Sequence, residues 1–351
     1  PRNRIYDLAE FEQYLRFKPE IELEYVYYYG KGYLPYAKAA YDTMTLEQVV
    51  EDKCKYSGRD PKSFLSLDEV LKMDDISGEN GRFVRVITAA NGKKAFLRIY
   101  KDNHVYPYES QISTALKTLL QEAPMVGFVT GHKERSGMDM GEKGYGTFAS
   151  NKTFRYSLEN SGYGVREISL EHPVAEDINI IVLADMRSDF TEEEFRNFDA
   201  YLERGGNLFI LGEPKRQQFM NPVIERLGLR FADGIIVSPS EVNLDDLVAA
   251  NIKEGAAKVS ENYIRYFRSG YSIMTPSACA VEVIDSAKGF EITEVLASAG
   301  KGSWVEKETT DFINEKSVLN PAVGEVEKSN SIMLYLTRPV NNKEQRIFVI
   351  G

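Results

Sequence analysis

The hydrophobic pattern of the chain changes near residue 122 and predicts two regions. In the first region, "LAEFEQYLRF" places Leu8, Phe11 and Leu15 on one helical face, and "IELEYVYYY" then alternates as a strand does. The polar stretch that follows predicts short helices near residues 46–52 and 67–73. This order predicts a mixed α/β unit that begins with a helix followed by a strand.

The end of the first region predicts a hairpin followed by a helix. "RFVRVIT" and "KAFLRIY" flank Asn91-Gly92, a pair that favours a tight turn in which both residues take positive φ. "YESQISTALKTLL" then carries an apolar stripe at helical spacing, formed by Ile112, Ala115, Leu116 and Leu119. "QEAP" ends this helix, so we place a domain boundary at Glu122.

In the second region, strands alternate with helices. "INIIVLA" is a continuous apolar run of the kind found in parallel strands that are covered on both faces. The other predicted elements are a strand at Met125–Thr130, a helix in "FRYSLENSGYG" and a strand in "VREISL". From residue 273 onward strands dominate, in "AVEVID", "FEITEVLAS", "SIMLYLTRP" and "QRIFVIG".

The most clearly specified unit is "FTEEEFRNFDAYLERGGNLFILGEP". Thr191 and Glu194 have the spacing of a capping box at a helix start. Gly205-Gly206 is typical of a helix stop, because glycine adopts the left-handed conformation at little cost. With a strand on each side, this segment predicts a βαβ unit.

Composition indicates a globular protein of two domains. The chain has 351 residues, of which 43% are hydrophobic. Its 43 basic and 53 acidic residues give a net charge of −10, which argues against a nucleic-acid partner and against docking on anionic lipid. No apolar run is long enough to span a membrane and no signal peptide is present, so we expect the chain to be soluble as given.

Motifs for cofactors and metals are missing from the sequence. The two cysteines form no CxxC pair and the three histidines are scattered, so we predict no disulfide framework and no metal centre. The glycine-rich stretch Gly137–Gly146 matches neither a P-loop nor a dinucleotide fingerprint. Its two interpretations are a mobile loop and a lid that orders over a ligand. We expect no cofactor.

The candidate site residues are His132, Glu134, Asp185 and Glu213. Each follows a predicted strand of the second region, and open α/β sheets bind ligands outside the carboxyl ends of their strands. The four side chains are therefore expected to converge on one crevice as ligand contacts. The alternative for His132 is a satisfied turn residue. No GxSxG nucleophile motif is present, and we assign no catalytic residue.

A second candidate surface is the tyrosine-rich stretch "YVYYYGKGYLPYAKAAY". Tyr25, Tyr27 and Tyr29 share one face of a strand, which predicts that this face packs in a core. The tyrosines of residues 33–41 are less easily placed in a core and provide a candidate glycan- or partner-binding surface, because a phenol ring combines apolar area with a hydroxyl.

Several of these motifs together resemble a known family. "YESQISTALKTLL", "VGFVTGH", "DFTEEEFRNFDAYLERGGNLFILGEP" and "LTRPVNNKEQRIFVIG" are similar, in order and spacing, to the extracytoplasmic region of auxiliary ABC-transporter proteins related to the gliding-motility component GldG of Bacteroidetes. The match covers roughly residues 105–351. The family's TGH segment corresponds to Thr130, Gly131 and His132, and its helix stop to Gly205 and Gly206.

The resemblance implies a fold and a location. It implies a thioredoxin-like α/β domain over residues 1–122, lacking its first strand, followed over residues 123–351 by a flavodoxin- or class I amidotransferase-like domain with a mostly parallel sheet and a strand-rich C-terminal part. It also implies a periplasmic or extracytoplasmic location, with tethering to the inner membrane by segments outside this chain. The implied partners are the membrane permease and ATP-binding subunits of an ABC system.

Three functional hypotheses follow. The leading one is a non-enzymatic accessory domain of an ABC-type transport, gliding-motility or surface-assembly system that binds a partner protein or an envelope ligand. The second is a hydrolase or amidotransferase-like enzyme that uses His132 with Glu134 or Glu213. Glu213 stands where an amidotransferase-like domain usually has its cysteine, which argues against glutamine hydrolysis. The third is a glycan-binding module.

Overall fold

A computed structural model describes residues 2–30, 43–79, 83–100, 102, 104 and 106–351, and these residues form two compact units. Unit 1 contains the chain up to Glu122 together with residues 152–156 and 160–162. Unit 2 contains residues 123–151, 157–159 and 163–351.

Unit 1 is a mixed α/β unit. Its helices are α1 (Arg2–Phe17), α2 (Leu46–Ser57), α3 (Leu67–Met73) and α4 (Glu109–Leu120). Its strands are β1 (Tyr27–Tyr29), β2 (Phe64–Ser66), β3 (Val84–Thr88) and β4 (Lys94–Arg98). In the described residues β1 pairs with β2 in parallel and β3 pairs with β4 in antiparallel, as two separate sheets. The thioredoxin-like arrangement therefore stays a prediction.

The core of unit 1 lies between the hairpin and the helix that follows it. Ala95 and Leu97 of β4 are buried against Ala115 and Leu119 of α4, and Phe11 of α1 packs against the same cluster. These contacts follow from the predicted periodicities, because alternate residues of a strand and every third or fourth residue of a helix share a face. The first helix and the hairpin predicted from the sequence are thus present.

Two local predictions in this unit were wrong in detail. At the hairpin only Gly92 has positive φ, at 81°, and the side chain of Asn91 instead accepts a hydrogen bond from the backbone N–H of Lys93 at 3.0 Å. In α4 Leu116 is 42% exposed, so the buried stripe is narrower than predicted. A turn with one left-handed glycine closes the hairpin, and an Asn side chain can stabilise such a turn without changing its own φ.

A buried arginine fastens residues 152–156 into unit 1. The guanidinium of Arg155 donates to the carboxylate of Asp102 at 2.6 and 2.9 Å and to Oε1 of Gln111 at 2.7 Å. It also lies 4.5 Å from the ring centroids of both Tyr100 and Tyr108. The hydrogen bonds from Arg155 are the largest cause of a lowered pKa of Asp102. The arginine is therefore held by charge, hydrogen bonds and ring faces together.

Unit 2 contains the longer series of elements. Its helices are α5 (Gly146–Ala149), α6 (Glu192–Glu203), α7 (Gln217–Ile224), α8 (Ala256–Val259) and α9 (Tyr263–Arg268). Its first strands are β5 (Met125–Val129), β6 (Gly164–Ile168), β7 (Ile178–Ala184), β8 (Asn207–Leu211), β9 (Leu229–Phe231), β10 (Ile235–Val237) and β11 (Leu247–Ile252). Its later strands are β12 (Ser272–Pro276), β13 (Val281–Val283), β14 (Glu291–Ala297), β15 (Trp304–Glu306), β16 (Ser331–Val340) and β17 (Lys343–Ile350).

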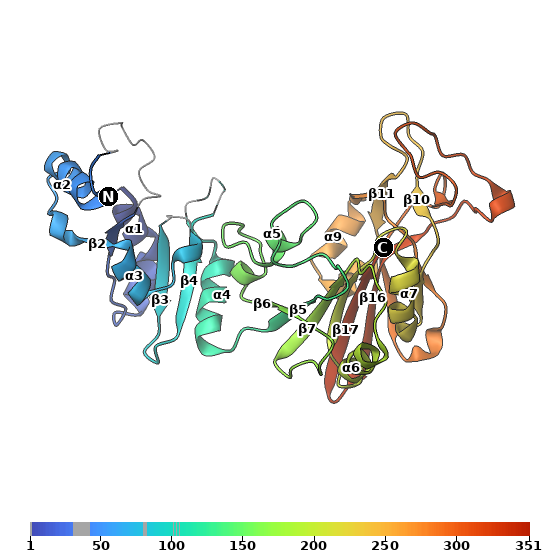
Figure 1. Ribbon diagram of the computed structural model, residues 1–351, viewed down its shortest axis with the longest axis horizontal. Coiled ribbons are helices and arrows are strands. Elements are labelled where there is room, and N and C mark those ends of the chain that lie inside the picture. Colours follow the sequence, from blue (N-terminus) through green and yellow to red (C-terminus); the bar gives the residue numbers. More distant parts are fainter. Residues whose placement is uncertain (1, 31–42, 80–82, 101, 103, 105) are drawn as a thin grey trace. The chain divides into compact units, whose positions relative to one another are not determined.

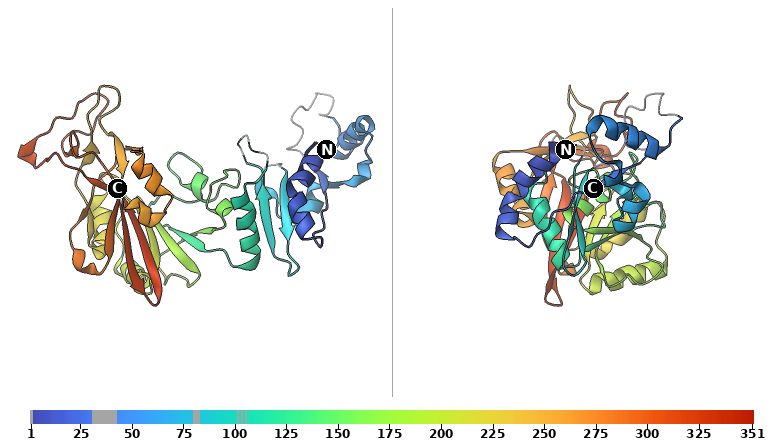
Figure 2. Two further views of the ribbon diagram at one scale, coloured as in Figure 1. Left: turned by 180° about the vertical axis from the view of Figure 1, so that it is seen from behind. Right: turned by 90° about the vertical axis from the view of Figure 1, so that its left-hand side faces the viewer.

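Among the described residues, nine of these strands form one mixed sheet, in the order β12-β11-β14-β16-β17-β8-β7-β5-β6 (Figure 1). The pairings from β17 through β8, β7 and β5 to β6 are parallel, and those from β12 to β17 are antiparallel. The sheet is therefore parallel in one half only, because the strand-rich C-terminal part adds an antiparallel half instead of extending the parallel one. Figure 2 shows the long β16–β17 hairpin in red.

Helices cover both faces of this sheet. On one face, α6 and α7 bury their apolar sides against alternate residues of the central strands in the largest core cluster. On the other face, the parallel strands pack against α5, and the antiparallel strands pack against α8. Figure 1 shows α7 and α9 on opposite sides of the sheet. A sheet covered on both faces explains why β7 is apolar at every position from Ile180 to Ala184.

The segment from β7 through α6 to β8 agrees with its sequence prediction. Thr191 and Glu194 form both hydrogen bonds of the capping box, and the helix is followed by Gly205 with φ of 86°. Gly206 has a different function, because a Cβ there would lie 2.2 Å from the ring of Tyr201. One glycine is thus required by backbone conformation, and the next by a close aromatic contact.

The helix predicted in "FRYSLENSGYG" is absent. The segment has a single 3-10 turn at Glu159–Ser161. The side-chain amide of Asn160 donates to the carbonyl oxygens of Lys152 at 3.2 Å and Phe154 at 2.7 Å. Such side-chain to backbone bonds compete with the helical pattern and explain the irregular course.

Replacing Arg155 with alanine is expected to destabilise unit 1 by about 2–3 kcal/mol, because it removes several charge-assisted hydrogen bonds of a buried group. Hydrogen exchange of the α4 amides and urea unfolding measure the loss. The control is Arg16→Ala, which removes an exposed i,i+4 pair with Glu12 and is expected to cost less than about 0.5 kcal/mol. Equal effects of the two substitutions would contradict this interpretation of Arg155.

Candidate functional site

The loops after β5, β7 and β8 lie at the same edge of the sheet, because these strands are adjacent and parallel. β5 has β6 on one side and β7 on the other, so the chain reverses its direction across the sheet at β5. Open α/β sheets bind ligands outside the carboxyl ends of their strands at such a reversal. The four predicted residues His132, Glu134, Asp185 and Glu213 all lie in these loops.

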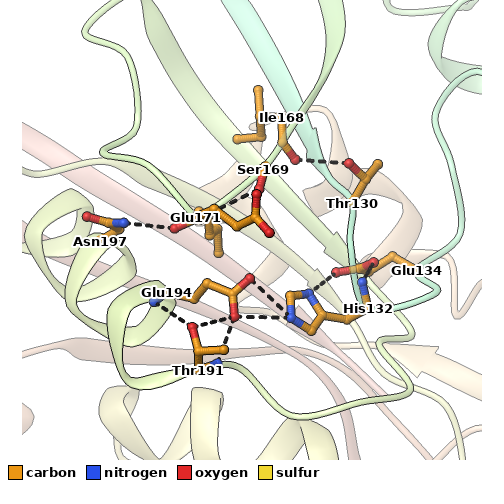
Figure 3. A network of polar contacts seen from close by, with 10 residues as sticks. Thr130, His132, Glu134, Ile168, Ser169, Glu171, Thr191, Glu194 and Asn197 are labelled. Carbon is orange, nitrogen blue, oxygen red and sulfur yellow. Dashed lines mark hydrogen bonds and ion pairs between the residues drawn. The ribbon is translucent and has the colours of Figure 1, made fainter.

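His132 is buried between two carboxylates (Figure 3). Its Nδ1 lies 3.1 Å from Oε1 of Glu134, and its Nε2 lies 3.2 Å from Oε1 of Glu194. Its backbone N–H also donates to Oε2 of Glu134 at 2.7 Å. Both ring nitrogens thus face carboxylate oxygens, and a ring nitrogen that carries a proton donates it to the carboxylate that it faces.

The local sequence produces this position. β5 ends at Val129, and Thr130 continues the pairing by donating its backbone N–H to the carbonyl oxygen of Ile168 at 2.9 Å. Gly131 then adopts φ of 125°, a conformation that residues with a side chain rarely take. This turn brings the imidazole of His132 against the ring of Phe190, with centroids 4.9 Å apart.

Glu194 connects the histidine to the start of α6. Its Oε2 accepts hydrogen bonds from the backbone N–H of Thr191 at 2.7 Å and from the Thr191 hydroxyl at 2.8 Å. Burial acts to raise the pKa of Glu194, but the hydrogen bonds from Thr191 and the nearby His132 outweigh burial and lower it. The glutamate of the α6 capping box is therefore also the partner of the strand-end histidine.

Asp185 and Glu213 belong to a second network. Asp185 is 1% exposed and accepts hydrogen bonds from Arg187, the shorter from Nη2 at 2.7 Å. Nε of Arg135 lies 3.6 Å and Nε of Arg216 lies 3.4 Å from its carboxylate oxygens. Glu213 is paired with Arg135. The four predicted residues are thus divided between two networks, and Glu213 pairs with Arg135, not with His132.

The sequence interpretation missed three arginines in this place. Arg135, Arg187 and Arg216 lie in the loops after β5, β7 and β8, and their side chains are 24%, 34% and 32% exposed. A basic residue in each loop after three parallel strands was the available signal. Their backbone also connects the two networks, because the N–H of Arg187 donates to the carbonyl oxygen of His132 at 2.8 Å.

The other features predicted from the sequence are the glycine-rich loop, the tyrosine surface and the absence of a metal centre and of membrane segments. The glycine-rich loop before α5 is held by backbone hydrogen bonds, from Tyr145 to Ser136 and from Gly146 to Asp139, both at 2.8 Å. The tyrosine surface of residues 33–41 lies outside the described residues. Among the residues that the structure describes, no cluster of His, Cys, Asp or Glu is arranged to hold a metal ion. No helix in the same part of the chain is long and apolar enough to cross a membrane.

Replacing His132 with alanine is expected to cost about 2–3 kcal/mol of stability, because it removes a hydrogen-bond partner of two buried carboxylates. Urea unfolding followed by circular dichroism measures this cost. The control is His172→Ala at an exposed histidine, where a change within about 0.5 kcal/mol is expected. A fully stable His132→Ala variant would show that the imidazole does not hold the two carboxylates together.

The lowered pKa of Glu194 predicts a pH dependence. Below its ordinary value of 4.5 the unfolded chain takes up a proton more readily than the folded one, so the contribution of Glu194 to stability is present above that pH and is lost as pH falls. In Glu194→Gln we expect a shallower loss of stability between about pH 5 and pH 3 than in the unsubstituted protein.

Unfolding free energies at several pH values test this expectation. Glu193→Gln, which removes an exposed carboxylate one residue earlier in α6, is the control for the loss of one charge at that helix end. Parallel pH curves for Glu194→Gln and the unsubstituted protein would count against the proposed contribution.

Comparisons with known proteins find a family match that lies mostly within unit 2. One family model matches residues 123–310. It describes the auxiliary component of an uncharacterized ABC-type transport system. No curated protein matches the chain in sequence. Two solved structures are similar over 65% of this chain. They are the mmIFT52 N-terminal domain, with 15% identity, 85% of that chain covered and a TM-score of 0.42, and a ThuA-like protein from Parabacteroides merdae, with 12% identity, 79% covered and a TM-score of 0.34.

The similarity to both solved structures is too low to carry a functional argument. The family match is different, because it extends from the start of β5 through β15 and includes the loops that hold His132, Asp185 and Glu213. The matched residues make up more than half of the 351 residues. The chain therefore belongs to this family of auxiliary components of ABC-type transport systems.

Proposed function

We propose that this protein is a non-enzymatic, extracytoplasmic accessory domain of an ABC-type transport system of the gliding-motility or surface-assembly kind, where it binds a partner protein or an envelope ligand. The observation that carries the proposal is the family match over residues 123–310. The permease and ATP-binding subunits of the same system are the partners of the full-length protein in this proposal.

The geometry of His132 supports binding over catalysis. A general base needs a ring nitrogen that is able to accept a proton from a nucleophile. Both ring nitrogens of His132 instead face buried carboxylates, within 3.2 Å. Glu213, at the position of the amidotransferase cysteine, is engaged by Arg135. The residues of the enzyme hypothesis are thus already engaged in contacts with one another, with Glu194 and with Arg135.

The strand order supports the expected type of domain. Numbered along the chain, the parallel strands β6-β5-β7-β8-β17 have the order 2-1-3-4-5, which is that of flavodoxin-type sheets. This order is part of the proposal of a flavodoxin- or amidotransferase-like domain. The thioredoxin-like assignment of unit 1 is likewise proposed, from its parallel strand pair followed by a hairpin and a helix.

The loop between β5 and α5 is the proposed contact for a partner protein. Met138 and Met140 in this loop are 44% and 51% exposed, and Phe148 in α5 is 62% exposed. Hydrogen bonds inside the loop hold it in place, including one from the backbone N–H of Gly141 to Asp139 Oδ1 at 2.8 Å. Exposed apolar side chains on an ordered loop suit a protein contact, because methionine adapts to the partner's surface.

Crosslinking in cells tests the proposal. A photoreactive phenylalanine analogue in place of Met140, in the full-length protein, is expected to yield a covalent product with the permease subunit of the ABC system. Mass spectrometry identifies the product. The matched control carries the same analogue at Val242, which is 89% exposed in a different loop of unit 2. Equal products at both positions, or none with a transporter subunit, would contradict the proposed contact.

The enzyme alternative has its own measurement. Hydrolysis of amide, ester and glycoside substrates by the purified chain is expected to stay at the background rate. A hydrolytic activity that disappears in a folded His132→Asn variant would overturn the non-enzymatic assignment. Binding on a glycan array would support the tyrosine hypothesis instead.

A further inference from the structure

We infer that Arg135, Arg187 and Arg216 form a site for a phosphate group at the carboxyl ends of β5, β7 and β8. The inference rests on the proposed function, because it names the chemical class of the envelope ligand. Three loops, each following a different parallel strand, contribute one guanidinium each, and all three are grouped around the carboxylate of Asp185.

The charges of this cluster leave an excess that an anion would neutralise. Three guanidinium groups face two carboxylates, those of Asp185 and Glu213. Lys133 and Lys215, in the same loops, are exposed, and Glu134 and Asp189 of those loops balance their charges. The whole chain carries a net charge of −10, so the local excess of positive charge has the opposite sign to the net charge of the protein. Such an arrangement concentrates anions at one place on an acidic protein.

Hydrogen bonding within the cluster is incomplete. Among the described residues, Nε of Arg135, Nε of Arg216 and Oδ1 of Asp185 are buried atoms without a hydrogen-bond partner. Buried polar groups in folded proteins are nearly always paired, so unpaired ones need a cause. The two Nε atoms face Asp185 at 3.6 and 3.4 Å, too far for a good hydrogen bond, so an anion would bind at the terminal N–H groups of the two guanidiniums. Only 1% of Asp185 is exposed, and its carboxylate holds the arginines in place.

The backbone is strained at one residue in each of these three loops. Lys133, Asp185 and Lys215 have φ of 60°, 51° and 64°, and they are half of the six non-glycine residues with positive φ in the described chain. Each lies in a loop after β5, β7 or β8. Residues with a Cβ rarely adopt positive φ. Such a conformation persists where the surrounding structure requires it, often at binding sites.

Phosphate fits this site better than a cation or a planar apolar ligand. Guanidinium groups bind phosphate oxygens in pairs of charge-assisted hydrogen bonds. Arg216 also immediately precedes α7, whose first turn has no side-chain cap and carries the positive end of the helix dipole. The guanidinium groups and the start of α7 therefore lie together, and this combination favours a tetrahedral oxyanion.

Isothermal titration of the full chain with inorganic phosphate and with glucose 1-phosphate tests the inference. We expect saturable binding of one ligand with a Kd below about 1 mM, because two or three charge-assisted hydrogen bonds supply that affinity. Vesicles of phosphatidylglycerol, with phosphatidylcholine vesicles as the blank, distinguish a lipid headgroup from a soluble phosphate. Binding to phosphatidylglycerol alone would identify the lipid as the source of the phosphate.

Arg216→Gln is the decisive variant. Arg216 faces Asp185 only as an ion pair at 3.4 Å and donates to the backbone of Lys215, while Arg187 keeps its hydrogen bonds to Asp185, so folding is expected to survive the substitution. Phosphate binding is expected to weaken about ten-fold or more. Arg216→Lys, which keeps the charge but loses the guanidinium fork, is expected to bind with intermediate affinity. The control is Arg166→Gln, which removes an exposed pair with Asp177 on β6 and is expected to bind as the unsubstituted chain does.

Binding that is absent in the unsubstituted chain, or that Arg216→Gln and Arg166→Gln reduce equally, would overturn the inference. The crosslink from position 140 distinguishes this failure from a failure of the proposed function. A permease crosslink without phosphate binding would remove the phosphate site and leave the accessory function standing. Phosphate binding without any transporter contact would keep the site and remove that function.

Discussion

The parallel pairing of β17 with β8 is the interaction on which the rest of unit 2 depends. β17 pairs with β16 in antiparallel and with β8 in parallel, so it joins the antiparallel half of the sheet to the parallel half. Gln345 of β17 is fully buried and donates to the carbonyl oxygens of Leu202 at 3.1 Å and Gly206 at 2.6 Å. The end of α6 is therefore satisfied by a strand that lies more than a hundred residues later in the chain.

The pairing of β17 with β8 also affects the opposite end of the parallel strands. With β8 held against both β7 and β17, the loops after β5, β7 and β8 leave the sheet side by side. The same edge then contains two kinds of charge network. One has an imidazole between Glu134 and Glu194, and the other has three guanidinium groups around Asp185. The first is fully paired and fits a structural function, whereas the second has unpaired donors and fits a binding function.

Sequence patterns predicted the elements whose signals are local. The capping box at Thr191 and Glu194 needs only residues three apart, and the apolar run of β7 reflects burial on both faces. Where a local signal competed with tertiary contacts, the prediction failed. The segment around Asn160 has a helix-like pattern, but the Asn160 amide donates to the nearby carbonyls of Lys152 and Phe154 and accepts from Arg98, 62 residues earlier, and the helix does not form.

The sequence by itself determined which residues stand at strand ends and what chemistry they carry, because these follow from periodicity and residue type. It placed His132, Glu134, Asp185 and Glu213 in one edge region on that basis. Only the tertiary structure decided which side chains pair, since partners such as His132 and Glu194 are 62 residues apart and meet through the order of the strands. For the same reason the three arginines became a cluster only when β5, β7 and β8 were placed side by side.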